Sequence, residues 1–149
     1  RVHTTVAKQL ALYVTLYSPI QMAADLPENY EKRPDVFQFI RDVPTDWADT
    51  KIINAAVGDY VTIARRDKHS SNWFIGSMTD ETPRNFKAKL DFLEPKKDYE
   101  ATIYADGPNA DFQKDPYPVA ISTVKVRKGD TLKLNLAAGG GCAVAIKAL

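Results

Sequence analysis

The spacing of apolar residues changes once along this 149-residue chain, near residues 44–50. Before that point apolar side chains recur every three or four positions, and after it they largely alternate with polar ones. The first period is typical of helices and the second of strands. Short strands with no helix between them indicate a sandwich or barrel. We therefore predict a mainly β fold, an antiparallel β-sandwich of about eight strands preceded by two or three helices.

The first 44 residues predict helices with more apolar surface than a small appendage can bury. Thr4 or Thr5 can cap the first helix, whose apolar positions run around most of its circumference. Pro19 ends that helix or starts a second one, which stops before Pro27. A third helix is predicted over residues 34–42, with Val36, Phe37, Phe39 and Ile40 on its buried face. Such a first helix expects neighbours on several sides, which suggests that part of a larger protein is absent.

Period-two segments separated by turn residues fill the remainder of the chain. The clearest is 86–92, where Phe86, Ala88, Leu90 and Phe92 alternate with charged residues, as in a half-buried strand. A long irregular segment covers residues 106–118. The other predicted strands are 60–64, 73–78, 99–104, 121–126, 131–136 and 142–148.

Charge and cysteine content exclude several classes of protein. The 20 basic and 19 acidic residues leave a net charge of +1, so nothing favours nucleic acid or an anionic membrane as a partner. No apolar run of about 18 residues predicts a membrane span. The single cysteine, Cys142, rules out an internal disulfide and a cysteine-based zinc site. It alternates in register with Val144, Ile146 and Ala148, which predicts a small core residue and not a nucleophile.

The acidic and histidine side chains give no catalytic pair. Glycoside hydrolysis needs two carboxyl groups on opposite sides of the bond, and nothing in the sequence pairs any two of the acids found in turns. Residues 106–111 carry oxygen ligands for calcium, but they lack EF-hand spacing and its closing glutamate, so an irregular surface loop is favoured. His69 lies in a polar turn and His3 near the start of the chain. We predict no catalytic residue and no metal ligand among the turn acids Asp80, Glu81, Asp106, Asp111 and Asp115.

Two further patterns have both a structural and a functional interpretation. The run of glycines at 139–141 precedes a strand and not a helix, so it predicts a turn or bulge and not a phosphate loop. A carbohydrate-binding module is the alternative function, because flat rings can stack on sugars, although aromatic residues in strands are more often core. The candidate rings are Trp47, Trp73, Tyr104 and Tyr117.

Taken together in order, several segments resemble the C-terminal region of glycoside hydrolase family 97. They are KQLALYV (8–14), YSPIQMAAD (17–25), PENY (27–30), FQFI (37–40), DVP (42–44), GDYVTIAR (58–65), NWFIG (72–76) and ATIYAD (101–106). The glycine run before the last strand also has its counterpart in that family. The match is collinear over nearly the whole chain, and it is weakest around residues 115–118.

The resemblance implies a role that the residues alone do not reveal. Family members are exported bacterial exo-acting α-glucosidases or α-galactosidases, built from a β-sandwich, a (β/α)8 barrel and a C-terminal β-sandwich. Their catalytic carboxylates and a calcium ion lie upstream of the matched segment. The resemblance thus implies that residues 1–44 are the terminal barrel helices and 45–149 the C-terminal sandwich. It implies an accessory or oligomerisation domain in a periplasmic or otherwise exported enzyme, inactive by itself. The implied partners are the upstream barrel, further copies of the protein and the parent's oligosaccharide substrate.

Overall fold

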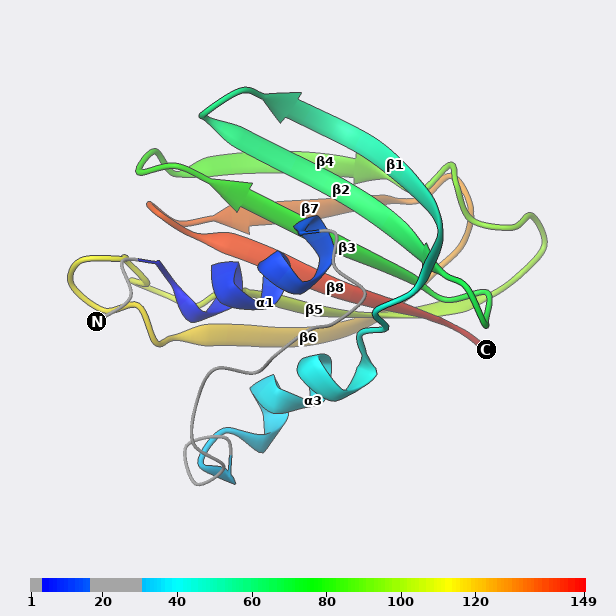
Figure 1. Ribbon diagram of the computed structural model, residues 1–149, viewed down its shortest axis with the longest axis horizontal. Coiled ribbons are helices and arrows are strands. Elements are labelled where there is room, and N and C mark those ends of the chain that lie inside the picture. The colour runs from blue at the N-terminus through cyan, green and yellow to red at the C-terminus, as the bar shows by residue number, and fades with distance from the viewer. Residues whose placement is uncertain (1–3, 17–30) are drawn as a thin grey trace.

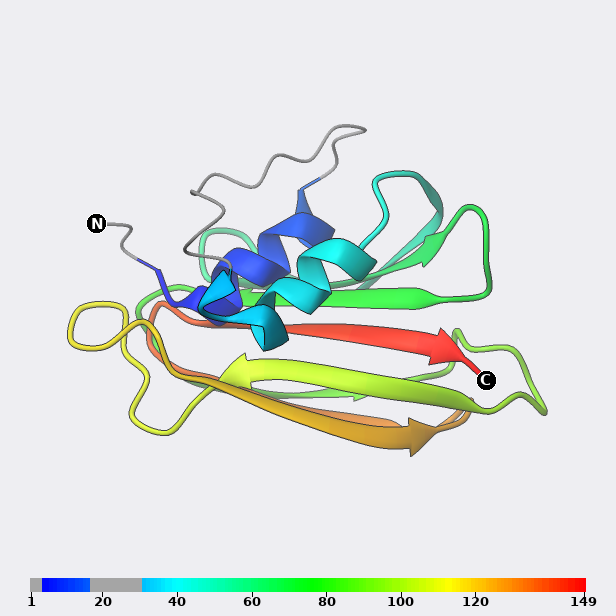
Figure 2. The same ribbon diagram turned by 90° about the horizontal axis from the view of Figure 1, so that it is seen from below.

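The computed structural model describes residues 4–16 and 31–149, which form three layers (Figures 1 and 2). A six-stranded sheet lies in the middle, helices cover one of its faces, and a two-stranded sheet covers part of the other. The helices are α1 (Val6–Thr15) and α3 (Pro34–Asp42). The strands are β1 (Trp47–Ala56), β2 (Tyr60–Asp67), β3 (Trp73–Thr79), β4 (Arg84–Lys89), β5 (Tyr99–Asp106), β6 (Val119–Val126), β7 (Thr131–Leu136) and β8 (Gly141–Ala148).

All strand pairs are antiparallel, which confirms the predicted mainly β sandwich of eight strands. The large sheet has the order β1-β2-β3-β8-β5-β6, and β4 pairs with β7 in the small sheet. The edges of the large sheet are therefore β1 and β6. The sequence did not predict β1 as a separate strand, because two register shifts interrupt its pairing with β2 and blur its period.

The core between the two sheets is formed by alternate residues of the strands. Tyr99, Leu134 and Val144 have no exposed surface, and Leu90 continues the alternation of β4 although the strand itself ends at Lys89. Cys142 is fully buried in the same cluster, as its register with Val144 and Ile146 predicted. Burial of each apolar side chain of this size stabilises the folded state by about 1.5–3 kcal/mol.

Helix α1 packs directly on the backbone of the central strands because glycine occupies the contact points. A Cβ at Gly76 of β3 would lie 2.6 Å from the Ala11 carbonyl oxygen, and one at Gly141 of β8 would lie 2.6 Å from the Lys8 Cα. The Thr5 hydroxyl caps the helix by accepting from the Lys8 N–H at 3.2 Å, which confirms one of the two predicted caps. The close approach makes α1 a layer of this fold.

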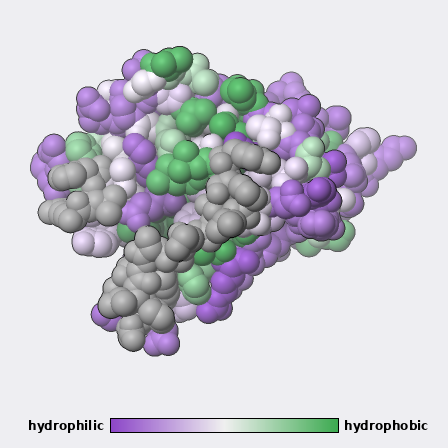
Figure 3. Space-filling model, viewed as in Figure 1, coloured by the Kyte–Doolittle hydropathy of each residue, from purple (hydrophilic) through white to green (hydrophobic). Residues whose placement is uncertain are grey.

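The sheet of this chain buries one side of α1, and the predicted contact of its other sides with a larger protein stays a prediction. The fully buried residues of α1, Ala7, Leu10, Ala11 and Val14, meet the protein's own sheet, so this chain itself covers one side of the helix. Leu16 at its end remains 56% exposed, and Ile52 of β1 is 70% exposed. Hydrophobic patches are visible on this side of the molecule (Figure 3). The predicted second helix lies outside the described residues.

Helix α3 has the predicted bounds and is held over the β5 side of the sheet. Phe39 contacts Phe74 and Tyr104 edge to face, with ring centroids 6.2 and 5.3 Å apart. Asp42 at its C-terminal end pairs with Lys147 of β8 at 2.7 Å. Val36 and Phe39 are buried, whereas Phe37 and Ile40 of the predicted buried face are only half-buried.

The outer face of the small sheet is polar and positively charged. Lys87 and Lys133 stand directly opposite each other, and Lys89 lies opposite Thr131. All of these residues are exposed. No helix among the described residues is long and apolar enough to cross a membrane.

Candidate functional site

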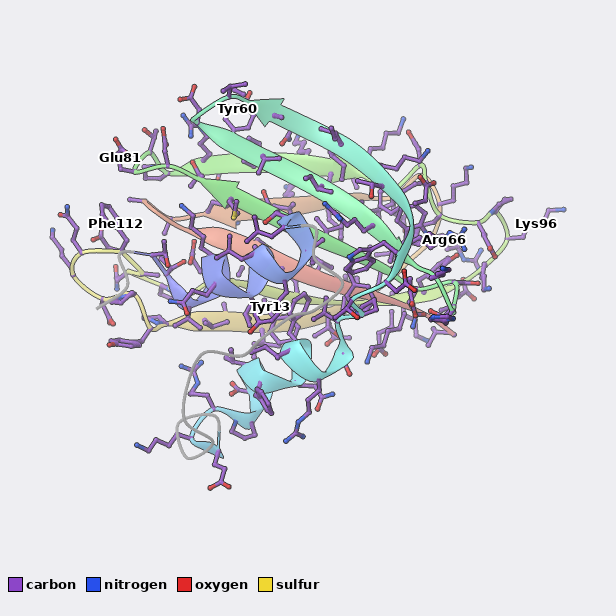
Figure 4. All side chains as sticks on the ribbon, viewed as in Figure 1. Tyr13, Tyr60, Arg66, Glu81, Lys96 and Phe112 are labelled. Carbon is purple, nitrogen blue, oxygen red and sulfur yellow. The ribbon has the colours of Figure 1, made fainter. Side chains whose placement is uncertain are left out.

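Three of the predicted turn acids lie near one lysine of α1 at the end of the sheet. Lys8 Nζ donates to the Thr79 carbonyl oxygen at 2.8 Å. Burial lowers the pKa of Lys8, and the nearby carboxylates of Asp80, Asp106 and Glu81 partly oppose that shift. Figure 4 shows Glu81 projecting outward from the turn between β3 and β4. Lys8 could not be predicted from the sequence, because it comes near these acids only when α1 packs on the sheet.

Asp106 at the end of β5 is the most buried of these acids, and its carboxylate binds backbone. Its Oδ2 accepts hydrogen bonds from the N–H groups of Ala137 at 2.8 Å and Gly141 at 3.0 Å. Burial raises the pKa of Asp106, while the Thr5 hydroxyl, these two N–H groups and Lys8 favour the charged form. These hydrogen bonds hold the glycine turn at 139–141 against the end of β5. This turn is the one predicted before the last strand.

The other acids organise turns and do not face each other across a cleft. Asp80 accepts from the Thr82 N–H at 2.9 Å and from Arg84 at 2.8 Å, and these contacts, the Thr82 N–H first, lower the pKa of Asp80. Asp111 accepts from the N–H groups of Lys114 and Gln113, which lower its pKa. Asp115 closes the same turn through backbone hydrogen bonds with Asp111. These are the solvated and turn roles that the sequence favoured.

The loop at 106–111 does not fit a calcium ion. Asp106 is directed at backbone N–H groups and Asp111 at its own turn, so their oxygens do not converge. Within residues 4–16 and 31–149, no three acidic, histidine or cysteine side chains gather as metal ligands. The resemblance places the calcium ion of the family upstream of the matched segment, and that stays a prediction.

Neither the cysteine nor the described histidine stands in a reactive arrangement. Burial raises the pKa of the Cys142 thiol far above its usual range, which opposes the thiolate that a nucleophile requires. His69 has 77% of its side chain exposed and lies 3.9 Å from the Asp46 carboxylate. His3 lies outside the described residues.

The four aromatic residues weighed as a sugar platform are divided among different places. Trp73 is 3% exposed between the sheets, and Tyr104 is 3% exposed under α3. Trp47 packs edge to face on Phe74, and Tyr117 is exposed in the loop before β6. Because the four rings do not lie together on one exposed surface, the geometry does not support a platform for sugar stacking. Trp47, Trp73 and Tyr104 pack in the core, and Tyr117 is exposed.

The most exposed regular element among the described residues is the edge strand β6. Residues 120–125 are all exposed, and Val124 and Ile121 are 44% and 38% exposed. The sequence predicted this strand but not its place, because strand order depends on contacts far apart in the chain. An unpaired strand edge offers backbone donors and acceptors to another chain, so β6 is the candidate site for association.

Comparison with known proteins identifies the family to which this fold belongs. Residues 46–147 match the family model described as glycosyl-hydrolase 97 C-terminal, oligomerisation. A retaining alpha-galactosidase of Bacteroides thetaiotaomicron is 36% identical over 96% of this chain, which corresponds to 21% of that protein. The chain therefore spans about a fifth of the length of this curated relative.

Solved structures give the same family. A glycoside hydrolase family 97 enzyme from Pseudoalteromonas, in complex with acarbose, superimposes with a TM-score of 0.97 and 50% identity over the whole chain and 23% of its own. A beta-arabinopyranosidase superimposes with a TM-score of 0.76 and 27% identity over 97% of this chain and 21% of its own. With a family match over most of its length, the chain belongs to glycoside hydrolase family 97, as the C-terminal oligomerisation region.

Proposed function

We propose that this chain is the non-catalytic module that joins copies of an exo-acting α-glycosidase. The observation that carries the proposal is the match of residues 46–147 to the family's oligomerisation region. The site geometry supports it, because the turn acids do not face each other as a pair. Asp106 and Asp111 bind backbone N–H groups, Asp80 binds Arg84, and Glu81 projects outward. Two carboxyl groups positioned for bond cleavage would then come from the remainder of the polypeptide.

The parent enzyme proposed here is an α-galactosidase or α-glucosidase acting on oligosaccharides. The relatives named retaining alpha-galactosidase favour the first substrate, and the acarbose complex of the Pseudoalteromonas enzyme favours a glucoside. We further propose an exported, periplasmic enzyme that binds calcium in its upstream domains. Residues 1–44 would be the terminal helices of its barrel, with α1 as the seam between barrel and sandwich.

Catalysis is tested by comparing the chain alone with the full polypeptide on nitrophenyl α-galactoside and nitrophenyl α-glucoside. We expect turnover only from the full polypeptide, because the chain alone supplies no paired carboxyl groups. Circular dichroism of the chain alone serves as the control for folding. Turnover by the folded chain alone would refute the non-catalytic role. The variant with both Asp80 and Asp106 replaced by asparagine would then show whether these two acids are responsible.

Oligomerisation is tested by sedimentation of the full polypeptide and of a version that ends before residue 45. We expect the full polypeptide to form a dimer or larger species and the shortened one to dissociate. A shortened polypeptide with the same sedimentation behaviour as the full one would place the association elsewhere.

A further inference from the structure

The β6 edge of the large sheet is long, regular and nearly uncharged. Its eight residues pair with β5 without a register shift, so its free side is continuous. Lys125 is its only charged residue. Figure 2, seen from below, shows β6 running along the near side of the molecule, with α1 and α3 in the helical layer. A long, apolar edge of this kind is an open template for strand pairing.

The opposite edge is protected in the way natural edge strands commonly are. In β1, register shifts fall between Trp47 and Asp49 and between Ile52 and Asn54. Asp49 and Lys51 form an ion pair at 3.5 Å on the same strand. Bulges and charges both discourage a further strand from pairing. Of the two edges of the large sheet, β6 is therefore the one suited to pairing.

Hydrogen bonds at the ends of β5 show which residues of β6 direct their backbone N–H and C=O groups outward. The Gly107 N–H donates to the Pro118 carbonyl oxygen at 2.9 Å, so the Pro118 carbonyl points toward β5. Successive residues of a strand direct their N–H and C=O groups to opposite sides. Residues 120, 122 and 124 therefore also bond β5. The residues with outward N–H and C=O groups are Val119, Ile121, Thr123 and Lys125.

A hydrogen bond on the other side of β5 gives the same phase. The Leu149 N–H donates to the Asp98 carbonyl oxygen at 3.0 Å, beyond the last pair of β5 and β8. Even-numbered residues of β5 thus bond β8, which leaves odd-numbered residues to bond β6. Since Ala101 pairs with Val124 and Ile103 with Ser122, the bonded residues of β6 are again the even-numbered ones.

We propose that two copies pair through β6, antiparallel about a twofold axis at Ser122, to join their large sheets. This inference rests on the proposed oligomerisation and names its surface. A twofold axis at Ser122 pairs Val119 with Lys125 of the second copy and Ile121 with Thr123. All four outward-facing residues are then used, and each such pair exchanges two backbone hydrogen bonds, about eight in total. An axis at Thr123 would leave Val119 opposite Arg127, beyond the strand.

The side chains are compatible with this register. A twofold axis perpendicular to the sheet keeps each face on its own side, so Ala120 lies opposite Val124 of the second copy on the small-sheet side. Lys125 lies opposite Val119 and not opposite its own symmetry mate, so no like charges meet directly. Exposed apolar surface at Val124 and Ile121 is covered in the same contact, which favours association.

A cysteine at the twofold axis tests the register directly. Ser122 would form a non-hydrogen-bonded pair with its mate, with Cα atoms about 4.5 Å apart, within the range that a disulfide spans. In the full polypeptide we expect Ser122→Cys to give a disulfide-linked dimer on mild oxidation. The matched controls are the unsubstituted polypeptide and Thr50→Cys on the exposed part of β1. Equal cross-linking at positions 122 and 50, or none at 122, would overturn the proposed register.

Two substitutions at Thr123 test whether the β6 edge forms the dimer contact. Two are used so that the test still stands if one variant fails to fold. Thr123→Pro removes an outward N–H and spares the bonds to β5, and Thr123→Lys places a charge at the centre of the contact. Each should raise the dimer dissociation constant at least roughly tenfold, while Thr123→Val should not. Dimers that persist in both variants would refute the β6 surface but not oligomerisation. A strictly monomeric unsubstituted polypeptide would refute both proposals.

Discussion

Asp106 connects three parts of the chain through one carboxylate. It ends β5, accepts from the backbone of the turn before β8, and lies beside Thr5 and Lys8 at the start of α1. The fit is tight, since a Cβ at Gly140 would lie 1.9 Å from its Oδ2. The sequence identified both Asp106 and the glycine turn, but not that one binds the other, because they are far apart along the chain.

Stability should depend on pH through Asp106. Burial raises its folded pKa above the unfolded value, so its contribution to stability is fully present below the unfolded pKa. That contribution is lost as the pH rises through the folded pKa. Asn at this position does not titrate. We expect the melting temperature of the unsubstituted chain, relative to Asp106→Asn, to fall as the pH rises above the unfolded pKa of about 4.

The control for this measurement is Asp111→Asn, because the pKa of Asp111 is shifted downward by backbone N–H groups. Stability from Asp111 is present above its unfolded pKa and lost as the pH falls. The difference in melting temperature should therefore change with pH in the opposite direction. A difference for Asp106→Asn that stays constant with pH would contradict the assignment.

At the scale of elements, the contact of α1 with β3 depends on Gly76. A Cβ there would lie 2.6 Å from the Ala11 carbonyl oxygen and 2.9 Å from the Val14 Cβ. Backbone cannot move aside as a flexible side chain can, so Gly76→Ala should destabilise the fold by about 1–3 kcal/mol. Hydrogen exchange of the amides in α1 should become faster, together with a lower melting temperature.

Gly58→Ala provides the matched comparison. Gly58 has a φ of +81° and no atom within 4 Å of an added Cβ, so alanine there strains only the turn between β1 and β2. This substitution should lower the free energy of unfolding by about 1 kcal/mol. Hydrogen exchange of the α1 amides should not become faster relative to that of the other helices and strands. Faster exchange of α1 in both variants would show that Gly76 has no special role in docking.

The elements that the sequence predicted well are those whose pattern is local. The helix at 34–42 has Pro34 at its first turn, and β7 shows its alternation of exposed and buried residues within six residues. The edge position of β6 and the docking of α1 depend on pairings across the chain. Periodicity reports which residues are buried but not what covers them, so the sequence could not predict that the sheet of this chain covers one side of α1.

At the scale of the whole molecule, the helical layer covers a second apolar core. Phe74, Tyr104, Ala143 and Ala145 lie on the helical face of the large sheet and are nearly fully buried. A chain reduced to residues 45–149 would expose this surface. We expect it to bind the dye ANS and to unfold at a lower temperature than residues 1–149, which serve as the control. Equal melting temperatures without dye binding would mean that the sandwich does not need these helices.

The lysines of the small sheet have a consequence for how an assembly can grow. Lys87 and Lys133 face each other on the side of the molecule away from the helices, where a second molecule would bring the same cations into contact. Stacking through that face is electrostatically unfavourable. Growth by layering is thereby discouraged, so a pair that closes on itself can remain finite and dispersed in water.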